Sequence, residues 1–331
     1  MNLKTDYSVL KSIVAINLDV SIWSARRKLT PEDLGDIKLP PEELASLGSK
    51  KICDPQEMRV FGKLKSRAVG ALTKSGIRFL GGWAIAENNV AELVKELEEI
   101  RKDFLVAKNN FMSHYDQSVK DWIKHKPDWE KIIANSVVSA QYVSQRMNFS
   151  WQVFKVEAPI ANTDSSKKTV EAGLQNEVGN LGVTLFDEIA KSAKEAWRHS
   201  YLGKTEITRK ALSPLKNIYK KLQDLSFIEP RVGPVASLIN TALSKIPKKG
   251  VINGMELLML QGLLALLGDT QALTNYGQEI IDGRSSQSIL DCLIQNNSST
   301  PKRTTRVKQS SASQAIAVPA MQLQLDSMGL W

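Results

Sequence analysis

The sequence predicts a predominantly α-helical protein with a small antiparallel β-sheet, an α+β fold that includes a pair of long amphipathic helices. Two segments, near 89–115 and 169–199, carry apolar residues at the three- and four-residue spacing of a helix face. Segment 14–22 instead alternates apolar and polar residues, as a half-buried strand does. Hydrophobic residues make up 42% and charged residues 24% of the chain, a balance typical of a folded globular protein.

Two further segments complete the expected sheet. A strand at 77–85 would contain a bulge or a close backbone approach at Gly81 and Gly82. It would place four apolar side chains on one face: Ile77, Phe79, Trp83 and Ile85. A third strand is expected at 149–156, around Trp151. Together with 14–22 these segments predict a small antiparallel sheet of three strands, whose pairing order the residues leave open.

The helix at 54–76 has the clearest boundaries. Asp54 is a good N-cap residue, Pro55 suits the first helical position, and Gly76 ends the apolar periodicity. The helix near 89–115 is longer, about 40 Å at 1.5 Å per residue.

The second long helix, near 169–199, contains Gly179 and Gly182. We interpret both glycines as positions where a neighbouring element packs closely. Because both long helices are amphipathic, we expect them to pack as an antiparallel pair.

Shorter helices and changes in composition define the organisation of the chain. Gly and Pro separate further helices expected near 204–225, 232–243, 255–267 and 271–281. The chain is therefore divided into an N-terminal α+β region at 1–157, a loop at 158–168, a helical region at 169–296 and a disordered basic and apolar tail at 297–331. The tail is rich in Ser, Thr, Gln and Ala and shows no apolar period in its basic part.

The net charge of +9 lies mainly at the two ends of the chain. Residues 1–80 contain 14 Lys and Arg against 9 Asp and Glu, and residues 282–331 contain 5 against 3. The first residues lack the pattern of a secretory signal. No apolar segment approaches the roughly 20 residues of a membrane helix. We therefore expect a cytoplasmic protein without membrane association.

Basic residues at both ends are candidate contacts for an anion or a nucleic acid: Arg26, Arg27 and Lys28, and in the tail Lys302, Arg303, Arg306 and Lys308. Two other groups, Lys50 with Lys51 and the run Lys63, Lys65 and Arg67, would extend the N-terminal group if the fold gathers them on one side. No nucleic-acid-reading motif accompanies these residues.

The sequence contains no recognisable catalytic motif. His114, His125 and His199 share no metal-ligand spacing, and neither a Gly-x-Ser-x-Gly elbow nor a phosphate-binding glycine loop occurs. The two cysteines, Cys53 and Cys292, are not at a paired spacing. We therefore expect a non-enzymatic protein that needs no cofactor or metal.

The last residues of the chain are apolar and end on a tryptophan. Leu325, Met328, Leu330 and Trp331 are candidate docking residues for a groove on a partner protein. Two alternatives remain open, which are docking of this segment onto its own domain and a frayed end without function.

Several short motifs resemble one family. They are Ile22-Trp23-Ser24-Ala25-Arg26-Arg27-Lys28-Leu29, Leu39-Pro40-Pro41-Glu42, Leu47-Gly48-Ser49-Lys50, Asp54-Pro55 and Arg78-Phe79-Leu80-Gly81-Gly82-Trp83. A weaker likeness continues through Trp122, Trp129 and Trp151 to about residue 281. The pattern is similar to the domain-of-unknown-function family 3150 of bacteria, phages and integrative elements.

That resemblance implies a genomic and physical context. Such proteins are similar to ones encoded beside a MoxR-type AAA+ ATPase, like the cobaltochelatase small subunit, and a von Willebrand A-domain protein. The leading hypothesis is therefore a non-enzymatic adaptor, scaffold or substrate of such an ATPase system, with protein partners. The alternative is a nucleic-acid-binding accessory protein of a mobile element, based on the basic ends. The residues leave the oligomeric state open.

Overall fold

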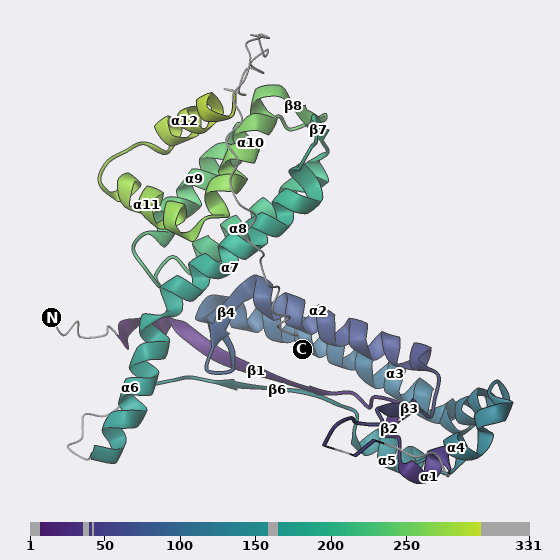
Figure 1. Cartoon of the computed structure of the whole chain (residues 1–331). Helices are drawn as coiled ribbons and strands as arrows, with labels where there is room; N and C mark the ends of the chain where they lie inside the picture. The colour runs from purple at the N-terminus through teal and green to yellow at the C-terminus, as the bar shows by residue number, and fades with distance from the viewer. Residues whose placement is uncertain (1–6, 36–39, 42, 158–164, 299–331) are drawn as a thin grey trace, which may run out of the picture. The chain divides into compact units, whose positions relative to one another are not determined.

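The computed structural model describes residues 7–35, 40–41, 43–157 and 165–298, and Figure 1 shows their arrangement. The expected α+β class is confirmed, because the protein is 66% helical and contains a small antiparallel sheet. The described residues all lie within one compact unit, Met1–Ser298.

Four antiparallel strands form the sheet in the order β4-β5-β1-β6. They are β1 (Ile13–Ser21), β4 (Gly76–Phe79), β5 (Gly82–Ala86) and β6 (Asn148–Phe154). The first residues of β1 pair with β5, where Ile13 lies opposite Ala86. The pairing of β1 with β6 extends to Ser21 opposite Asn148. The strand expected at 14–22 is therefore a central strand of the sheet.

The segment 77–85 forms two strands and not one. Leu80 and Gly81 connect β4 to β5 as a two-residue turn, and both have positive φ, 47° and 77°. This is the backbone conformation of a type I′ turn, whose twist suits a β-hairpin. Because the turn reverses the chain, Ile77 and Trp83 pack into different hydrophobic cores. The prediction of a three-stranded sheet with a single strand at 77–85 is wrong for this reason. The close backbone approach expected at Gly82 is confirmed, because a Cβ atom there would clash with the carbonyl oxygen of Ile16.

The two faces of the sheet contact different helices. Ile13 and Ala15 point into a core formed with the C-terminal helices. Ile16 and Val20 point into a second core, which contains α2 (Arg59–Ser75) and α3 (Val90–Lys124). Since successive side chains of a strand point to opposite faces, β1 contributes to both cores.

The two long helical segments pack on different partners. α3 runs for 35 residues and packs along α2, as Figure 1 shows. The second segment is divided into α6 (Ser165–Gly179) and α7 (Leu181–Ala196), followed by a π-helical turn, η5 (Trp197–Tyr201). α7 contacts β4 and helices of the C-terminal region. The expected antiparallel packing of the two long helical segments is wrong, because α3 and α7 contribute to separate cores on opposite faces of the sheet.

The two glycines interpreted as packing positions differ in their surroundings. A Cβ atom at Gly182 would lie 3.2 Å from the Cβ of Glu229, so a side chain there would crowd its neighbour. Gly179 is the last residue of α6 and has nothing within 4 Å of its Cβ position. Only Gly182 therefore fits the packing interpretation.

The remaining C-terminal helices pack around the apolar helix α10, which contacts α7, α9, α11 and α12. Their bounds are α8 (Ser213–Asp224), α9 (Val232–Ser244), α10 (Gly254–Leu267), α11 (Thr270–Ile281) and α12 (Ser286–Ser298). A short turn, η6 (Arg209–Leu212), precedes α8, and β7 (Glu206–Ile207) pairs with β8 (Ile252–Asn253). The helices expected from 204 to 281 are confirmed, although α8 begins later than its pattern suggested.

Short elements connect the N-terminal strands and helices. They are η1 (Tyr7–Ser12), β2 (Arg26–Lys28), α1 (Pro31–Leu34), β3 (Ser49–Lys51), η2 (Pro55–Met58), η3 (Glu87–Asn89), η4 (Pro127–Trp129), α4 (Glu130–Ala134) and α5 (Ala140–Gln145). The side chain of Asp54 accepts a hydrogen bond from the backbone N–H of Gln56 at 2.9 Å, as expected of a cap. It caps η2, a 3-10 turn that leads directly into α2.

Within the described ranges, no helix taken singly is long and apolar enough to cross a membrane. The helices α10 and α11 reach the required length only together, and they are bent by 106° relative to each other.

Candidate functional site

The ribbon formed by β2 and β3 concentrates positive charge. Five of its six residues are Lys or Arg, the exception being Ser49. The strand register places Arg26 opposite Lys51 and Arg27 opposite Lys50. Like charges directly opposite each other on paired strands are destabilising. The ribbon is therefore a place where a carboxylate or a bound anion stabilises the fold.

Asp33 supplies such a carboxylate to one lysine of the ribbon. Lys50 Nζ forms an ion pair with Asp33, and both side chains are largely buried. Burial raises the pKa of Asp33, but hydrogen bonds from Lys50 and Thr30 outweigh this effect and leave the pKa below its usual value. The positive charge of Lys50 is thus balanced within the protein.

A pocket of about 850 Å³ beside the ribbon has no carboxylate among the described residues that line it. Its cations are Arg26 and Arg27 from β2, Lys65 from α2 and Arg146 at the end of α5. We call it the basic pocket. The ring of Tyr142 lies beside two of these cations, with its centroid 5.1 Å from Cζ of Arg27 and 4.4 Å from Cζ of Arg146. Cation–π contacts of this kind hold the two guanidinium groups in the pocket wall.

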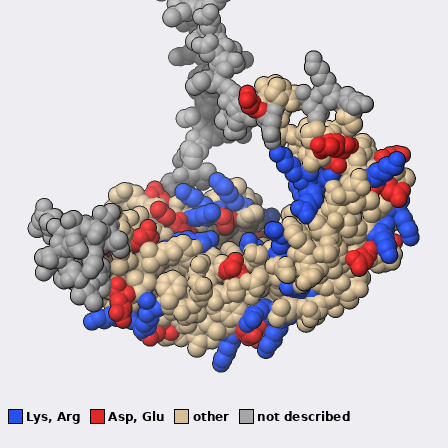
Figure 2. Space-filling view, turned by 90° about the horizontal axis from the view of Figure 1, so that it is seen from below, with Lys and Arg blue, Asp and Glu red and all other residues tan. Residues whose placement is uncertain are grey.

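The helix that contributes Lys65 adds to the positive charge. α2 contains five Lys and Arg residues and no Asp or Glu. One of them, Arg67, is paired with Asp103 of α3 at 2.9 Å, and Lys65 Nζ donates to the carbonyl oxygen of Val20 at 3.2 Å. On the face drawn in Figure 2, Lys and Arg are interspersed with Asp and Glu. The described lining of the basic pocket, in contrast, contains cations and no carboxylate.

The structure tests which predicted anion contacts meet in space. Arg26 and Arg27 line the basic pocket together with Lys65. The sequence predicted that Lys65 would join this group only if the fold brought the basic residues to one side. Lys28 lines an adjacent pocket that also contains Glu32 and Asp33. Lys302, Arg303, Arg306 and Lys308, and the docking candidates Leu325, Met328, Leu330 and Trp331, lie outside the described residues. No sequence pattern singles out Arg146, which joins the pocket only because α5 packs near β2.

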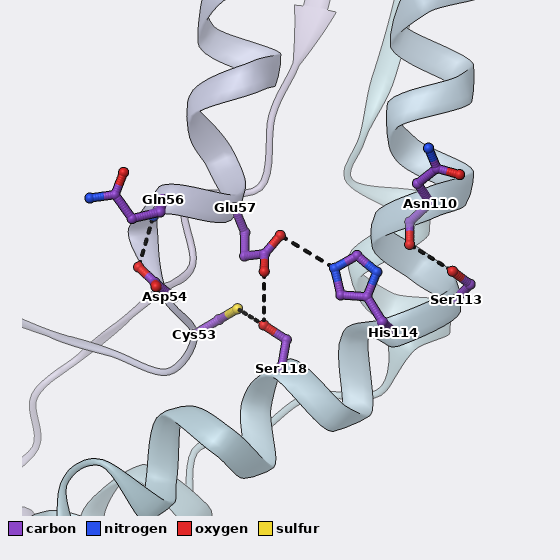
Figure 3. A network of polar contacts seen from close by, with 8 residues as sticks. All are labelled: Cys53, Asp54, Gln56, Glu57, Asn110, Ser113, His114 and Ser118. Carbon is purple, nitrogen blue, oxygen red and sulfur yellow. Dashed lines mark hydrogen bonds and ion pairs between the residues drawn. The ribbon is translucent and has the colours of Figure 1, made fainter.

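A second polar arrangement connects η2 to α3, as Figure 3 shows. The Ser118 hydroxyl lies 3.6 Å from Cys53 Sγ and donates to Glu57 Oε1 at 3.4 Å. Glu57 Oε2 is 3.3 Å from Nε2 of His114. This contact between His114 and a carboxylate joins residues 57 positions apart, which no local spacing predicts.

The order of these groups does not suit nucleophilic catalysis. A Ser or Cys nucleophile needs a base that takes its proton, usually a histidine in direct contact. Here the carboxylate of Glu57 separates His114 from Ser118. Cys53 is fully buried, and burial raises the pKa of its thiol. We interpret the network as a polar link that fixes η2 against α3. Among the described residues, no group of three or more His, Cys, Asp or Glu is arranged to hold a metal ion.

A third feature is a groove of about 640 Å³ between α2, α7, η5, η6 and α8. Lys221 of α8 lines it and, at 6% exposure of the whole residue, is the least exposed charged residue among those the structure describes. Its Nζ donates to Glu188 Oε2 at 2.6 Å and to the carbonyl oxygen of Thr73 at 2.8 Å. The backbone N–H of Arg78 on the edge strand β4 donates to the other oxygen of Glu188 at 3.2 Å. The Lys221–Glu188 pair therefore connects α8 and α7 to α2 and to the sheet. We call this the Lys221 groove.

The fold and these sites define an α+β protein with a four-stranded antiparallel sheet between two helical cores and two pockets rich in cations. The chain belongs to the family described as Protein of unknown function (DUF3150), whose model matches residues 10–269. The resemblance that the N-terminal motifs suggested is thereby confirmed. No curated protein and no solved structure matches the chain.

Proposed function

We propose that this protein binds nucleic acid without a catalytic step and that the basic pocket holds the backbone phosphates. The observation that carries this proposal is the meeting of Arg26, Arg27, Lys65 and Arg146 in a pocket whose described lining contains no carboxylate. Phosphate contacts through Lys and Arg supply most of the affinity of nonspecific nucleic-acid binding. A nucleic acid also offers a row of phosphates, which matches cations spread over three elements.

The position of Tyr142 argues for phosphate contacts and not for base stacking. Two guanidinium groups, those of Arg27 and Arg146, already lie at its ring. A base that stacked on this ring would have to displace one of them. Binding should therefore depend little on base sequence and strongly on salt concentration.

The test compares the full chain with a variant that carries Arg26→Gln and Arg27→Gln. Fluorescence anisotropy with a 20-nucleotide single strand and a 20-base-pair duplex is measured from 50 to 200 mM salt. We expect the variant to bind about tenfold more weakly at low salt. The slope of log affinity against log salt concentration should become shallower by roughly 0.7 to 0.9 for each phosphate contact removed. A matched control, Lys120→Gln with Lys216→Gln, removes two exposed cations outside the pocket and should leave binding unchanged.

Two results would overturn the proposal. One is the absence of binding at 50 mM salt, and the other is an equal loss of affinity in the control variant. Equal binding of vesicles with an anionic lipid surface, reduced by the same pair of substitutions, would assign the pocket to membranes instead.

A second proposal comes from the family resemblance. In it, the chain is a cytoplasmic adaptor, scaffold or substrate of a MoxR-type AAA+ ATPase and von Willebrand A-domain system in a bacterium, phage or mobile element. The resemblance of the sequence motifs motivates this role, and the docking candidates Leu325 to Trp331 give it a place to be tested. Deletion of 325–331 should abolish co-purification with the ATPase or the A-domain protein in mild salt. If the full chain retains neither protein, the adaptor role is excluded.

A further inference from the structure

The Lys221 groove combines an apolar floor with charged walls. Ile189, Ala196 and Ile218 line it and are buried in the core of the C-terminal region. Three lysines face the same space from three elements: Lys74 of α2, Lys210 of η6 and Lys221 of α8. His199 also lines the groove, and Glu195 is its one lining carboxylate among the described residues. Such a combination of apolar surface and a few convergent polar groups is typical of a small-molecule site.

Lys221 is the best-positioned of these polar groups. An ammonium group has three N–H donors, and the protein uses two of them, toward Glu188 and Thr73. Lys221 is also among the residues that line the groove. A ligand oxygen in the groove can therefore accept the third hydrogen bond from an ammonium that is already fixed in place, and little side-chain freedom is lost on binding.

The elements that surround Lys221 in the groove are also fixed in position, and they favour the binding of an anion. The hydroxyl of Tyr201 donates to the carbonyl oxygen of Ala211 at 2.9 Å, which ties the π-helical turn η5 to η6. The first turn of α8, at Ser213 and Pro214, lines the groove, and the amino end of a helix carries partial positive charge. π-helical turns recur at functional sites of other proteins.

We infer that the Lys221 groove binds a small organic phosphate, with its phosphate group near Lys221, Lys74 and Lys210 and its apolar part against Ile189 and Ile218. A phosphate group matches three lysines better than a single carboxylate would, because it carries more charge and offers more acceptor oxygens. The volume of about 640 Å³ falls within the range of small-ligand pockets. This site is separate from the basic pocket, because the two share no lining residue.

The test uses three matched probes on the full chain: 1-naphthyl phosphate, 1-naphthoate and uncharged 1-naphthol. Isothermal titration calorimetry should show that 1-naphthyl phosphate binds and that 1-naphthol binds about tenfold more weakly or not at all, since it lacks the charge-assisted hydrogen bonds. Equal binding of 1-naphthol would overturn the inference of an anion site. Equal binding of 1-naphthoate would overturn the assignment of a phosphate.

Three variants locate the probe without removing Lys221. Lys74→Gln with Lys210→Gln changes two exposed wall residues and should weaken 1-naphthyl phosphate about tenfold. Asn217→Trp should fill the groove and abolish binding. Lys216→Gln is the control, because this exposed neighbour on α8 does not line the groove. Unchanged affinity in both groove variants, or an equal loss in the control, would overturn the site. Unaltered thermal unfolding confirms that each variant is folded.

Discussion

The basic pocket and the Lys221 groove show two ways in which one chain handles positive charge. Lys221 is 6% exposed and donates hydrogen bonds to a carboxylate and a carbonyl oxygen of the protein. Arg26 is exposed in a pocket whose described lining has no carboxylate. A buried charge must be paired for the fold to tolerate it, whereas water alone can solvate an exposed one. The charge of Lys221 is therefore paired within the protein, whereas the exposed charge of the basic pocket is available to the proposed anionic partner.

The strongest test of this contrast is a pair of matched substitutions, Lys221→Met and Arg26→Met. Removing Lys221 leaves Glu188 without its ion-pair partner in a partly buried position. Because Glu188 keeps some solvent contact, we expect a loss of about 2 to 4 kcal/mol, somewhat below that of a fully buried pair. The loss from Arg26→Met should stay within about 0.5 kcal/mol, as for most surface substitutions. Urea unfolding measures both.

A second variant tests whether the loss of stability comes from the unpaired carboxylate of Glu188. Lys221→Met combined with Glu188→Met removes both charges and should recover part of the lost stability, since an apolar pair of similar volume can replace a buried ion pair. If the double variant is less stable than Lys221→Met alone, the cost comes from packing and not from an unpaired carboxylate.

The pH dependence of stability should separate the two sites further. Burial lowers the pKa of Lys221 below the usual 10.5, although Glu188 opposes the shift. The folded protein then releases this proton before the unfolded chain does, so the free energy of unfolding rises with pH in the window just below 10.5. The gain relative to Lys221→Met is at most about 1.4 kcal/mol per pH unit. Urea unfolding of both proteins between pH 8 and 10.5 checks the sign.

The control for this measurement is Arg26→Met, which should follow the wild type across the same pH range. A constant difference between the wild type and Lys221→Met would show that Lys221 titrates alike in the folded and unfolded states. That result would contradict the role of burial.

The smallest effect is expected at Tyr142, where the basic pocket is organised by cation–π contacts. Tyr142→Leu removes the ring beside Arg27 and Arg146. Each contact at an exposed site contributes about 0.5 to 1 kcal/mol. Only part of this energy acts on the bound state, through the positions of the guanidinium groups, so we expect nucleic-acid affinity to fall by the equivalent of one contact, roughly two- to fivefold. Fluorescence anisotropy at 50 mM salt measures the loss. A larger loss than that caused by Arg26→Gln with Arg27→Gln would assign a direct stacking role to Tyr142.

Local patterns in the sequence predict most of the elements and part of the candidate site. The period of two persists along the whole segment 14–22, and the helical period near 89–115 persists over several turns. These patterns therefore predict β1 and α3. The cations Arg26 and Arg27 are also visible as a run. The hairpin of β4 and β5 is missed, because its turn places Leu80 in a left-handed conformation that non-glycine residues rarely adopt.

By itself, the sequence determined the secondary structure of the long periodic segments, since hydrophobic period and capping act between near neighbours. Only the tertiary structure decided which helices cover which face of the sheet, because the apolar stripe of either long helix can pack against either face. It also decided the sites. Arg146 reaches the basic pocket through the packing of α5, and Lys221 meets Glu188 and Thr73 across 33 and 148 residues of chain. Contacts at such separations depend on how the cores pack, and no local pattern encodes them.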